Sequence, residues 1–471
     1  MSLTIGLINT SLPSYFPQRH GVFTDARLLL DNIAAREGYT VVEADGIPMD
    51  AAQACVAVAE VTAAGADFIL LLHGGFTMGD VVREIALSPL PLGIWATPEP
   101  ALTKDIQLNN FVSLNMSMSI VRGVRDLKVN PVQWYLGAPN EPALAARLEQ
   151  TLTALRARSA LKGARIGMIG GLAPTFYNME VSSDTLMRQL GVSVEHIDIH
   201  VMTNLMAAQL EDDVSAELAE MTGAADVRGV SDVQMDLTVR AVLALRGIAK
   251  KGGYDALTVS DWPALQENPG MHPGAAFSWL EEKDTLPVAS EGDILGAVTQ
   301  LVVKAFTGRV GCLLDMTSPD FENNKILMWH GGGGPLYMSR DRVSWINHPM
   351  IGRGTEEGPV FGAIADYEFE LGDVTVLRVS RNGTAQFAVE GQVLKGKESG
   401  FDGCRGWVGN FRSLAGPCCA HDVVTTVMEQ GLEHHFVLVQ GKHLNAFEEF
   451  GRWCRMVQLN IIPAHAGLPS H

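Results

Sequence analysis

The chain of 471 residues lacks a long apolar run, a surplus of positive charge and a long apolar leader. No apolar stretch reaches the ~20 residues that a helix needs to cross a bilayer. Acidic residues outnumber basic ones, 53 against 35, which gives a net charge of −18. This balance argues against partners such as nucleic acid or an anionic membrane. The opening, M-S-L-T-I-G-L-I-N-T, has no basic stretch followed by an apolar core, so we expect no signal peptide and a cytoplasmic protein.

Cysteine and nucleotide-binding patterns are also scarce. The six cysteines show no C-x-x-C spacing, which predicts reduced thiols in a long cytoplasmic chain. Adjacent Cys418 and Cys419 would point apart in a strand and cannot clip one metal ion. Glycines gather at Gly170 and at Gly331 to Gly334, but neither the phosphate loop G-x-x-x-x-G-K-[ST] nor the dinucleotide fingerprint G-x-G-x-x-G is present. Nucleotide chemistry is therefore not expected.

Apolar strands alternate with helical segments in the first part of the chain. Residues 4–10 form a short apolar strand, and the fully apolar run at 68–73 is typical of a parallel strand buried on both faces. Residues 25–36 and 50–65 have helical composition. This rhythm predicts a doubly wound parallel sheet, which we assign to an N-terminal α/β domain, residues 1–157.

The same rhythm continues in a second α/β domain and then changes. We expect the second doubly wound, Rossmann-like domain at residues 158–308, ending in a helix from about Gly292 that Ser290 caps. Beyond it, D-V-T-V-L-R-V-S-R-N-G-T-A-Q-F-A-V alternates and contains Asn382-Gly383, a strong hairpin signal. Residues 309–471 are therefore expected to form a mainly antiparallel β-barrel-type domain.

Four residues in the second half of the chain look like one metal site. Glu291 follows the strand V-A-S, and Asp315 ends the apolar run V-G-C-L-L. His330 ends K-I-L-M-W-H, and His435 is the second of a pair that opens the strand F-V-L-V. Two carboxylates and two imidazoles suit a divalent ion of intermediate hardness, such as Mn²⁺ or Co²⁺, better than a structural Zn²⁺ cage. Mg²⁺ is a further alternative.

Each of these residues also has a plain structural interpretation. A carboxylate in the first turn of a helix, like Glu291, simply favours the helix dipole. An aspartate at a strand end is usually a turn former, and Asp320 and Glu322 compete with Asp315. Consecutive strand residues point to opposite faces, so only one of His434 and His435 is expected to face the site. Glu433 or His434 could orient a ligand by a hydrogen bond.

The settings of these residues resemble the superfamily of L-arabinose isomerase and L-fucose isomerase, which are metal-dependent aldose–ketose isomerases. The similarity lies in E-G-D at Glu291, in D-M-T-S-P-D-F-E-N-N-K-I-L-M-W-H from Asp315 to His330, and in H-H-F-V-L-V-Q-G-K-H followed by N-A-F-E-E-F-G-R-W. It runs along most of the chain and is sharp from about Asp255 onward. The second carboxylate is Asp315, as in fucose isomerases, and not the glutamate of arabinose isomerases.

The resemblance implies two α/β domains, a C-terminal β-barrel-type domain and a metal held by Glu291, Asp315, His330 and His435, with His435 and not His434 as the last ligand. It implies isomerisation of a small fucose- or arabinose-like sugar through an enediol, with Glu291 and Asp315 as the acid/base pair. Relatives form tetramers or hexamers in which a neighbouring first domain covers the pocket. The candidate substrate contacts are His20, Asn115 and Trp262.

Weaker candidates have plainer interpretations. His20 and Asn115 are expected in loops at strand ends, where solvated residues are common. Trp262 and Trp95 are more often core or interface aromatics than sugar platforms, and His73 and Asp261 follow apolar strands as marginal candidates. Two other functions stay open: a metal-dependent hydrolase or lyase acting on a carbohydrate, which would need a metal-activated water, and a non-catalytic sugar-binding protein. The sequence does not name the sugar, the base or the metal.

Overall fold

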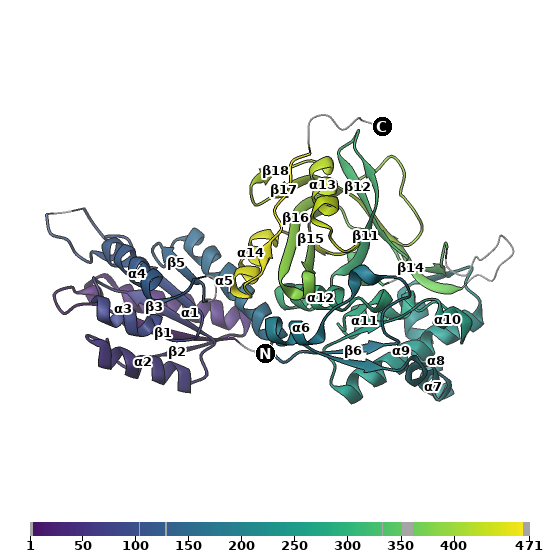
Figure 1. Ribbon diagram of the computed structural model, residues 1–471, viewed down its shortest axis with the longest axis horizontal. Helices are drawn as coiled ribbons and strands as arrows, with labels where there is room; N and C mark the ends of the chain where they lie inside the picture. Colours follow the sequence, from purple (N-terminus) through teal and green to yellow (C-terminus); the bar gives the residue numbers. More distant parts are fainter. Residues whose placement is uncertain (1–2, 103, 128–129, 332, 351–360, 465–471) are drawn as a thin grey trace. The chain divides into compact units, whose positions relative to one another are not determined.

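The computed structural model describes residues 3–102, 104–127, 130–331, 333–350 and 361–464. Gly332, in the run of four glycines, lies outside these ranges. The chain forms two compact units: Met1–Ser159 with Arg452–Arg455, and Ala160–Gly451 with Met456–His471 (Figure 1). The predicted central and C-terminal domains fall together in the second unit, and the boundary between them stays a prediction. Within the described residues, no helix is both long and apolar enough to span a membrane.

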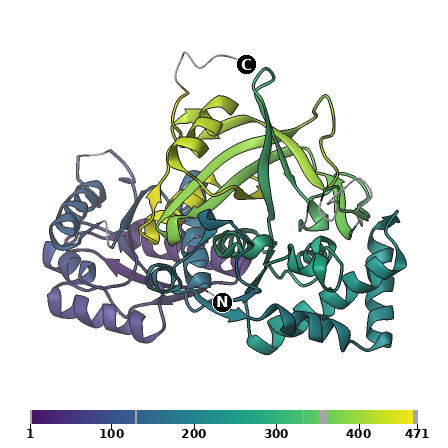
Figure 2. The ribbon, with the colours of Figure 1, turned by 45° about the vertical axis from the view of Figure 1, so that its right-hand side comes forward.

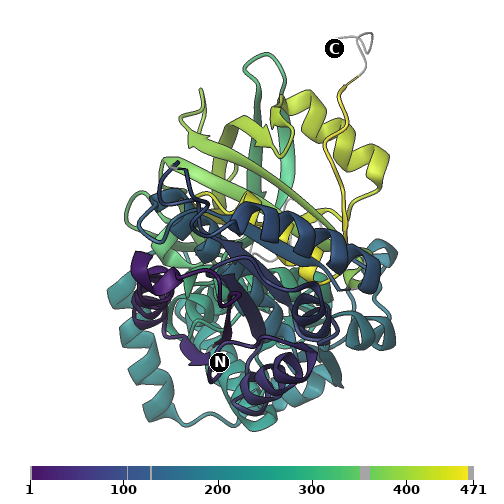
Figure 3. The same cartoon turned by 90° about the vertical axis from the view of Figure 1, so that its left-hand side faces the viewer.

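The first unit is built on a parallel sheet in the strand order β2-β1-β3-β4-β5. The direction of strand addition reverses after β2, so right-handed crossovers place α1 on the face opposite α2, α3 and α4. In Figure 3, where this unit faces the viewer, helices lie on both sides of the sheet. The elements are β1 (Thr4–Thr10), α1 (Val22–Glu37), β2 (Thr40–Glu43), α2 (Ala51–Ala63), β3 (Phe68–His73), α3 (Gly79–Ala86), β4 (Leu92–Ala96), α4 (Asn110–Val124), β5 (Val132–Leu136) and α5 (Pro142–Leu161).

A second parallel sheet, in the order β10-β9-β6-β7, opens the second unit. The α/β class and the parallel sheets expected from the sequence are thus confirmed. The elements of this part of the second unit are β6 (Arg165–Ile169), α6 (Ser183–Leu190), β7 (Ser193–Ile197), α7 (Ile199–Ala207), α8 (Glu211–Ala224), β8 (Asp226–Arg228), α9 (Asp232–Gly252), β9 (Ala256–Val259), α10 (Ala264–Glu267), α11 (Gly274–Lys283), β10 (Val288–Ala289) and α12 (Ile294–Thr307).

The rest of the second unit is a mixed, mainly antiparallel sheet, whose long strands lie side by side in Figure 2. β16 pairs with both β15 and β17, and Arg381–Gly383 form the expected turn between β15 and β16. The barrel-type arrangement stays a prediction. The elements are β11 (Cys312–Asp320), β12 (Lys325–His330), β13 (Ser344–Asn347), β14 (Gly362–Glu368), β15 (Gly372–Ser380), β16 (Ala385–Leu394), β17 (Cys404–Ser413), β18 (Gly416–Pro417), α13 (Ala420–Gln430), β19 (His435–Gln440), α14 (Leu444–Trp453) and β20 (Val457–Gln458).

Helix α12 connects the two sheets of the second unit. It contacts β9 and β10 of the parallel sheet and β11, β15 and β19 of the mixed sheet, and most of its side chains are buried. The expected cap, Ser290, is wrong: Asp293 caps the helix, because its carboxylate accepts the Gly296 N–H at 2.9 Å. Ser290 belongs instead to a separate helical turn, Ser290–Gly292, that precedes α12.

Candidate active site and metal centre

Glu291 lies at the carboxyl edge of the parallel sheet, in the turn between β10 and α12. Its backbone is left-handed, with φ 61° and ψ 13°, which costs about 1–3 kcal/mol for a residue other than glycine. The Glu291 N–H donates to Asp261 Oδ1 at 2.7 Å, and the Ala173 N–H donates to the Glu291 carbonyl at 3.0 Å. Asp261 follows β9, the strand next to β10. Neighbouring strand ends therefore hold this peptide from both sides.

Aromatic rings surround the Glu291 carboxylate. Trp262 donates its indole N–H to Glu291 Oε1 at 3.2 Å. The Phe176 ring lies edge-on to Trp262, with ring centres 5.4 Å apart, and edge-on to His434, with ring centres 5.0 Å apart. One oxygen of Glu291 is thus engaged by Trp262, while Oε2 faces the histidines. Whether Trp262 also contacts substrate stays a prediction.

Strand register places Asp315 and His435 opposite each other. β11 lies between β12 and β19, and Asp315 is paired with Trp329 on one side and with His435 on the other. Paired residues on neighbouring strands have side chains within contact distance. His330 follows Trp329 as the last residue of β12. Three adjacent strand segments therefore deliver three of the four predicted ligands.

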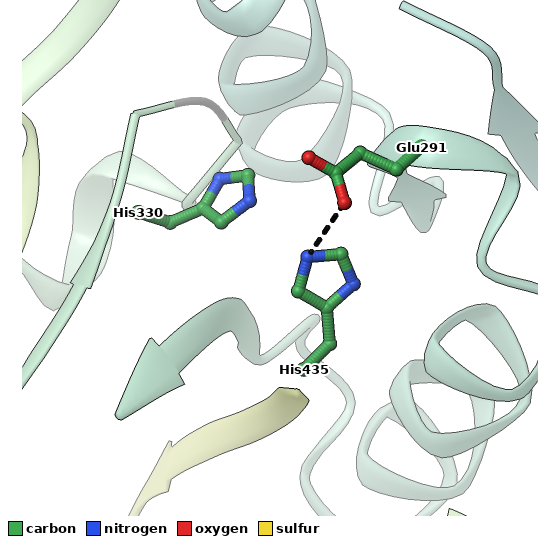
Figure 4. A group of neighbouring side chains, drawn as sticks. All are labelled: Glu291, His330 and His435. Atoms are coloured by element: carbon green, nitrogen blue, oxygen red, sulfur yellow. Dashed lines mark ion pairs between the residues drawn. The ribbon is translucent and has the colours of Figure 1, made fainter. Parts of the chain in front are cut away.

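The other three predicted ligands lie around His435, although the four residues come from two different sheets. His435 Nε2 lies 3.4 Å from Glu291 Oε2 and 3.9 Å from Asp315 Oδ1. The His330 and His435 rings lie edge-on, with centres 5.3 Å apart. Figure 4 shows Glu291, His330 and His435 pointing toward a common volume.

The donor atoms of this cluster fit a divalent cation. Two groups could hold an ion, Glu291 with His330 and His435, and Asp315 with His434 and His435, because within each group the ligand atoms lie within 4.8 Å of one another. In the described part of the chain, Asp315 Oδ1, His330 Nδ1 and His435 Nε2 are buried without a hydrogen-bond partner. Buried polar atoms normally have partners, so these atoms suit a bound ion. The ligand roles themselves stay a prediction.

Both histidines of the pair face the site, so the expectation that only one can do so is wrong. His434 Nε2 lies 3.2 Å and His435 Nε2 lies 3.4 Å from Glu291 Oε2, and the two rings have centres 4.3 Å apart. The alternation of strand residues does not apply, because β19 begins at His435 and His434 precedes it. On its other side, His434 Nδ1 lies 3.1 Å from Asn178 Nδ2. His434 is therefore a neighbour of Glu291 and a second candidate donor.

Burial and carboxylates act in opposite directions on the two buried histidines. Burial lowers the pKa of His330, and the nearby Asp315 charge only partly opposes it. Burial also lowers the pKa of His435, but its hydrogen bond to Asp293 and the charges of Asp315 and Glu291 outweigh that effect and raise the pKa overall. His330 therefore favours the neutral form that a metal ligand needs.

The carboxylates of Glu291 and Asp261 have pKa values that are shifted in opposite directions. Burial works to raise the pKa of Glu291, yet its hydrogen bond with His434 and the charges of His435 and His330 leave that pKa below its ordinary value. Burial and the neighbouring Glu291 charge raise the pKa of Asp261 to about 7. Glu291 therefore favours the ionised form at neutral pH, where Asp261 is close to half protonated.

A cavity of about 580 Å³ in the second unit has Asp315 and His434 in its wall. Asn178 and Thr317 supply further polar groups there. Gly431 also lines the cavity. The other lining residues are apolar: Met316, Pro319, Ile326, Val424, Val427, Met428, Leu432 and Phe436. A ligand in this cavity would meet the polar groups of the site along one part of the wall.

The weaker candidates His20, Asn115 and Trp95 all lie in the first unit. His20 and Asn115 are exposed and lie in the first unit, and Asn115 is on α4 and not in a loop as expected. Their substrate contacts stay predictions. Trp95 is a core residue that donates to the Gly137 carbonyl at 2.9 Å.

His73 and Asp320 have structural partners. His73 is buried between Thr10, Thr77 and Ser117, within 3.2 Å of each of their hydroxyl oxygens. Asp320 accepts from the Asn323 N–H at the turn after β11. Neither residue is part of the two metal-ligand groups found among the described residues.

Sequence reasoning missed Asp293 and Arg378. Asp293 Oδ2 lies 3.1 Å from His435 Nδ1, and Arg378 pairs with Asp293. The available signals were the aspartate of E-G-D and an arginine within the apolar strand V-T-V-L-R-V-S. Glu433, one of the two residues that could orient a ligand, accepts from the Ser380 hydroxyl and the Arg381 N–H.

Comparison with known proteins shows similarity between this chain and sulfoquinovose isomerases. The sulfoquinovose isomerases of Priestia megaterium and Priestia aryabhattai are each 24% identical over 396 residues, which is 82% of this chain and 83% of theirs. That of Alkalicoccus urumqiensis is 24% identical over 366 residues, 77% of this chain and 79% of its own. This chain is a relative of sugar isomerases. The expected resemblance to sugar isomerases related to L-fucose and L-arabinose isomerases is confirmed, and such isomerases are intramolecular oxidoreductases.

Two further comparisons add nothing to this relationship. No family profile matches the chain. A solute-binding protein of an ABC transporter from Agrobacterium vitis, bound with alpha-D-tagatopyranose, is 12% identical and covers 66% of this chain and 90% of its own, but its TM-score is 0.18. A score this low supports no argument about the fold or the function of this chain.

Proposed function

We propose that this protein is a divalent-metal-dependent aldose–ketose isomerase that acts on a small sugar. The observation that supports the proposal is the pair of three-residue groups that share His435, one with Glu291 and His330 and one with Asp315 and His434. Among the described residues, Asp315, His330 and His435 each have a buried polar atom without a partner. The relationship to sulfoquinovose isomerases supports the same reaction class. A hydrolase or lyase with these ligands is the second candidate, but the relationship gives it no support.

The reaction moves one proton between C1 and C2 of the sugar and shifts the carbonyl from one carbon to the other. A bound Mn²⁺, or Co²⁺ or Mg²⁺, would polarise the carbonyl and stabilise negative charge on the sugar oxygens. Glu291, Asp315, His330 and His435 would hold this ion. Glu291 and Asp315 are also the proposed acid/base pair, one removing the proton through an enediol and its partner returning one.

The carboxylates of Glu291 and Asp315 have different surroundings. Trp262 engages Oε1 of Glu291 and leaves Oε2 directed at the histidines. Asp315 is partly exposed and lies in the wall of the 580 Å³ cavity. We propose that this cavity admits the sugar, which would bring C1 and C2 close to Asp315 and His434.

The decisive experiment is an isomerase assay with a panel of aldoses after removal of metal and addition of Mn²⁺. L-fucose, L-arabinose and sulfoquinovose belong in the panel, with deoxy and other anionic sugars. We expect an aldose to be converted to its ketose with no change of mass, and the activity to disappear with a chelator and return with Mn²⁺. Glu291→Gln should lower turnover by ~10² or more, the usual scale for loss of a general acid or base. Hydrolysis without isomerisation would instead support the second candidate.

We further propose that the protein is a homo-oligomer, a tetramer or hexamer, in which a neighbouring first unit completes the pocket and supplies His20 or Asn115. Light scattering at the assay concentration measures the assembly. A fully active monomer would contradict it.

A further inference from the structure

A buried chain of charged groups leads away from His435. Asp293 Oδ2 lies 3.1 Å from His435 Nδ1. Arg378, on β15, donates to both oxygens of Asp293, at 2.6 and 3.0 Å. Glu433 Oε2 lies 3.6 Å from Arg378 Nε and accepts the Ser380 hydroxyl at 2.7 Å. The side chains of Arg378 and Asp293 are completely buried.

The hydrogen-bond chemistry of Asp293 decides which histidine nitrogen carries the hydrogen. Asp293 accepts two N–H groups from Arg378 and one from Gly296. An ionised carboxylate has no hydrogen to donate, so the His435 nitrogen that faces it must be the donor. In the neutral ring, the lone pair is then on the other nitrogen. That nitrogen is Nε2, which faces Glu291 and Asp315.

Stability alone explains this arrangement poorly. Burying two ions costs several kcal/mol for each, so a buried ion pair is weak evidence for a stabilising role. The chain also contains a comparable two-pronged pair, Arg246 with Glu217 at 2.8 and 3.0 Å, whose arginine is partly exposed. That pair joins α9 to α8, so it offers a matched control for ion pairing without the histidine.

We propose that Asp293 and Arg378 are positioning residues, which fix the hydrogen of His435 on Nδ1 and so present Nε2 to a divalent cation. Arg378 holds Asp293 in one orientation, and Asp293 holds the ring. The inference rests on the proposed metal site, but the location of the hydrogen is a property of the metal-free protein and can be measured separately.

Asp293→Asn is the direct test. Asparagine keeps the shape of the side chain, but one of its two ends is an NH₂ donor. When its oxygen accepts from Arg378 and Gly296, the NH₂ faces His435 Nδ1 and favours hydrogen on Nε2, as in other Asp-to-Asn changes beside a functional histidine. Nitrogen-15 NMR of metal-free, histidine-labelled protein reads this hydrogen, and titration calorimetry measures the Mn²⁺ dissociation constant.

We expect Nδ1–H in the wild type, Nε2–H in Asp293→Asn, and a Mn²⁺ dissociation constant raised by roughly 10–100-fold. Glu217→Gln, which weakens the control pair, should leave both readouts unchanged. Arg378→Lys keeps the charge but cannot hold both oxygens, so it should weaken Mn²⁺ binding in the same direction.

Three results would overturn the proposal: an unchanged hydrogen position in Asp293→Asn, an equal loss of affinity in Glu217→Gln, or loss of the native fold in both Asp293→Asn and Arg378→Lys. If the wild type binds no Mn²⁺ while the hydrogen moves as expected, the positioning role holds and the proposed metal site fails.

Discussion

Glu291, a predicted metal ligand, has an unfavourable backbone conformation. Its φ of 61° persists because Asp261 and Ala173 bind the peptide on both sides. Strained residues of this kind tend to occur where surrounding structure fixes a functional group in place. The position of Glu291 therefore depends on the Asp261 carboxylate and the Ala173 N–H, which hold its peptide group.

Trp262 holds the Glu291 carboxylate itself, and this contact can be tested directly. Trp262→Phe keeps a ring but removes the N–H that reaches Glu291 Oε1 at 3.2 Å. A hydrogen bond to a charged group contributes about 1.5–3 kcal/mol, so we expect the isomerase kcat to fall by roughly ten-fold or more. Trp95→Phe is the matched control, since Trp95 donates only to the Gly137 carbonyl in the first unit. An equal fall of kcat in both variants would show that the effect is not specific to Glu291.

The two adjacent histidines can be separated by metal content. His435→Ala removes a buried nitrogen shared by both candidate ligand groups, whereas His434→Ala removes a more exposed one found in a single group. We expect His435→Ala to abolish Mn²⁺ binding and His434→Ala to weaken it far less, as measured by metal analysis of purified protein. If His434→Ala empties the site and His435→Ala does not, the ligand assignment is off by one residue.

The sequence was informative for side chains whose role depends on a local pattern. His330 and His435 stand at strand ends that the apolar runs located correctly. Asp293 and Arg378 could not be paired in the same way, because their contact joins positions 85 residues apart. The orientation of His434 was mispredicted because strand alternation fails one residue before the strand begins.

At the scale of elements, the turn Ser290–Gly292 fixes the site by close packing. Gly292 has φ 77°, and a Cβ there would meet the Gly171 carbonyl oxygen at 2.4 Å. Gly292→Ala should therefore displace the turn and Glu291 with it. We expect loss of Mn²⁺ affinity as well as stability, by calorimetry and thermal unfolding.

Gly308→Ala is the control for backbone strain at the other end of α12. Its φ is 75°, and among the described residues nothing lies within 4 Å of an added Cβ. It should cost about 1–2 kcal/mol of stability with unchanged Mn²⁺ affinity. Equal affinities in the two variants would mean that the packing at Gly292 does not position Glu291.

At the scale of the whole molecule, Glu281 makes stability depend on pH. Burial raises its pKa to about 8, and the hydrogen bond from Gln300 only partly opposes this, against an ordinary value of 4.5. Between these values the folded protein keeps a proton that the unfolded chain has lost. The free energy of unfolding therefore falls as pH rises, by up to roughly 1.4 kcal/mol per pH unit from this group.

Glu281→Gln should remove that slope. Denaturant unfolding at pH 4.5 and pH 8, the limits set by the two pKa values, should show the variant gaining stability over the wild type only at the higher pH. Glu217→Gln is the control. Its carboxylate has a pKa lowered to about 2, because its hydrogen bonds to Arg246 and Trp279 outweigh burial, so its effect should be nearly equal at both pH values. A difference between wild type and Glu281→Gln that does not change with pH would contradict the prediction.

Domain organisation was predictable only where the pattern is local. The alternation of strands and helices indicated both parallel sheets, since each crossover joins neighbours in sequence. The pairing of β8 with β13 was not predictable, because it joins a strand of the predicted central domain to the mixed sheet. Such long-range contacts leave no periodic signal in the sequence.

The four residues Arg452–Arg455 group with the first unit, although the chain on either side of them belongs to the second. Trp453 lies edge-on to Phe68 of β3, with ring centres 6.3 Å apart. During synthesis on the ribosome, residues 1–159 emerge long before this segment exists. The first unit can begin to fold early, but it reaches its final packing only after residues 452–455 have been translated. A nascent chain stalled anywhere before Arg452 would expose the surface on Phe68 that Trp453 later covers.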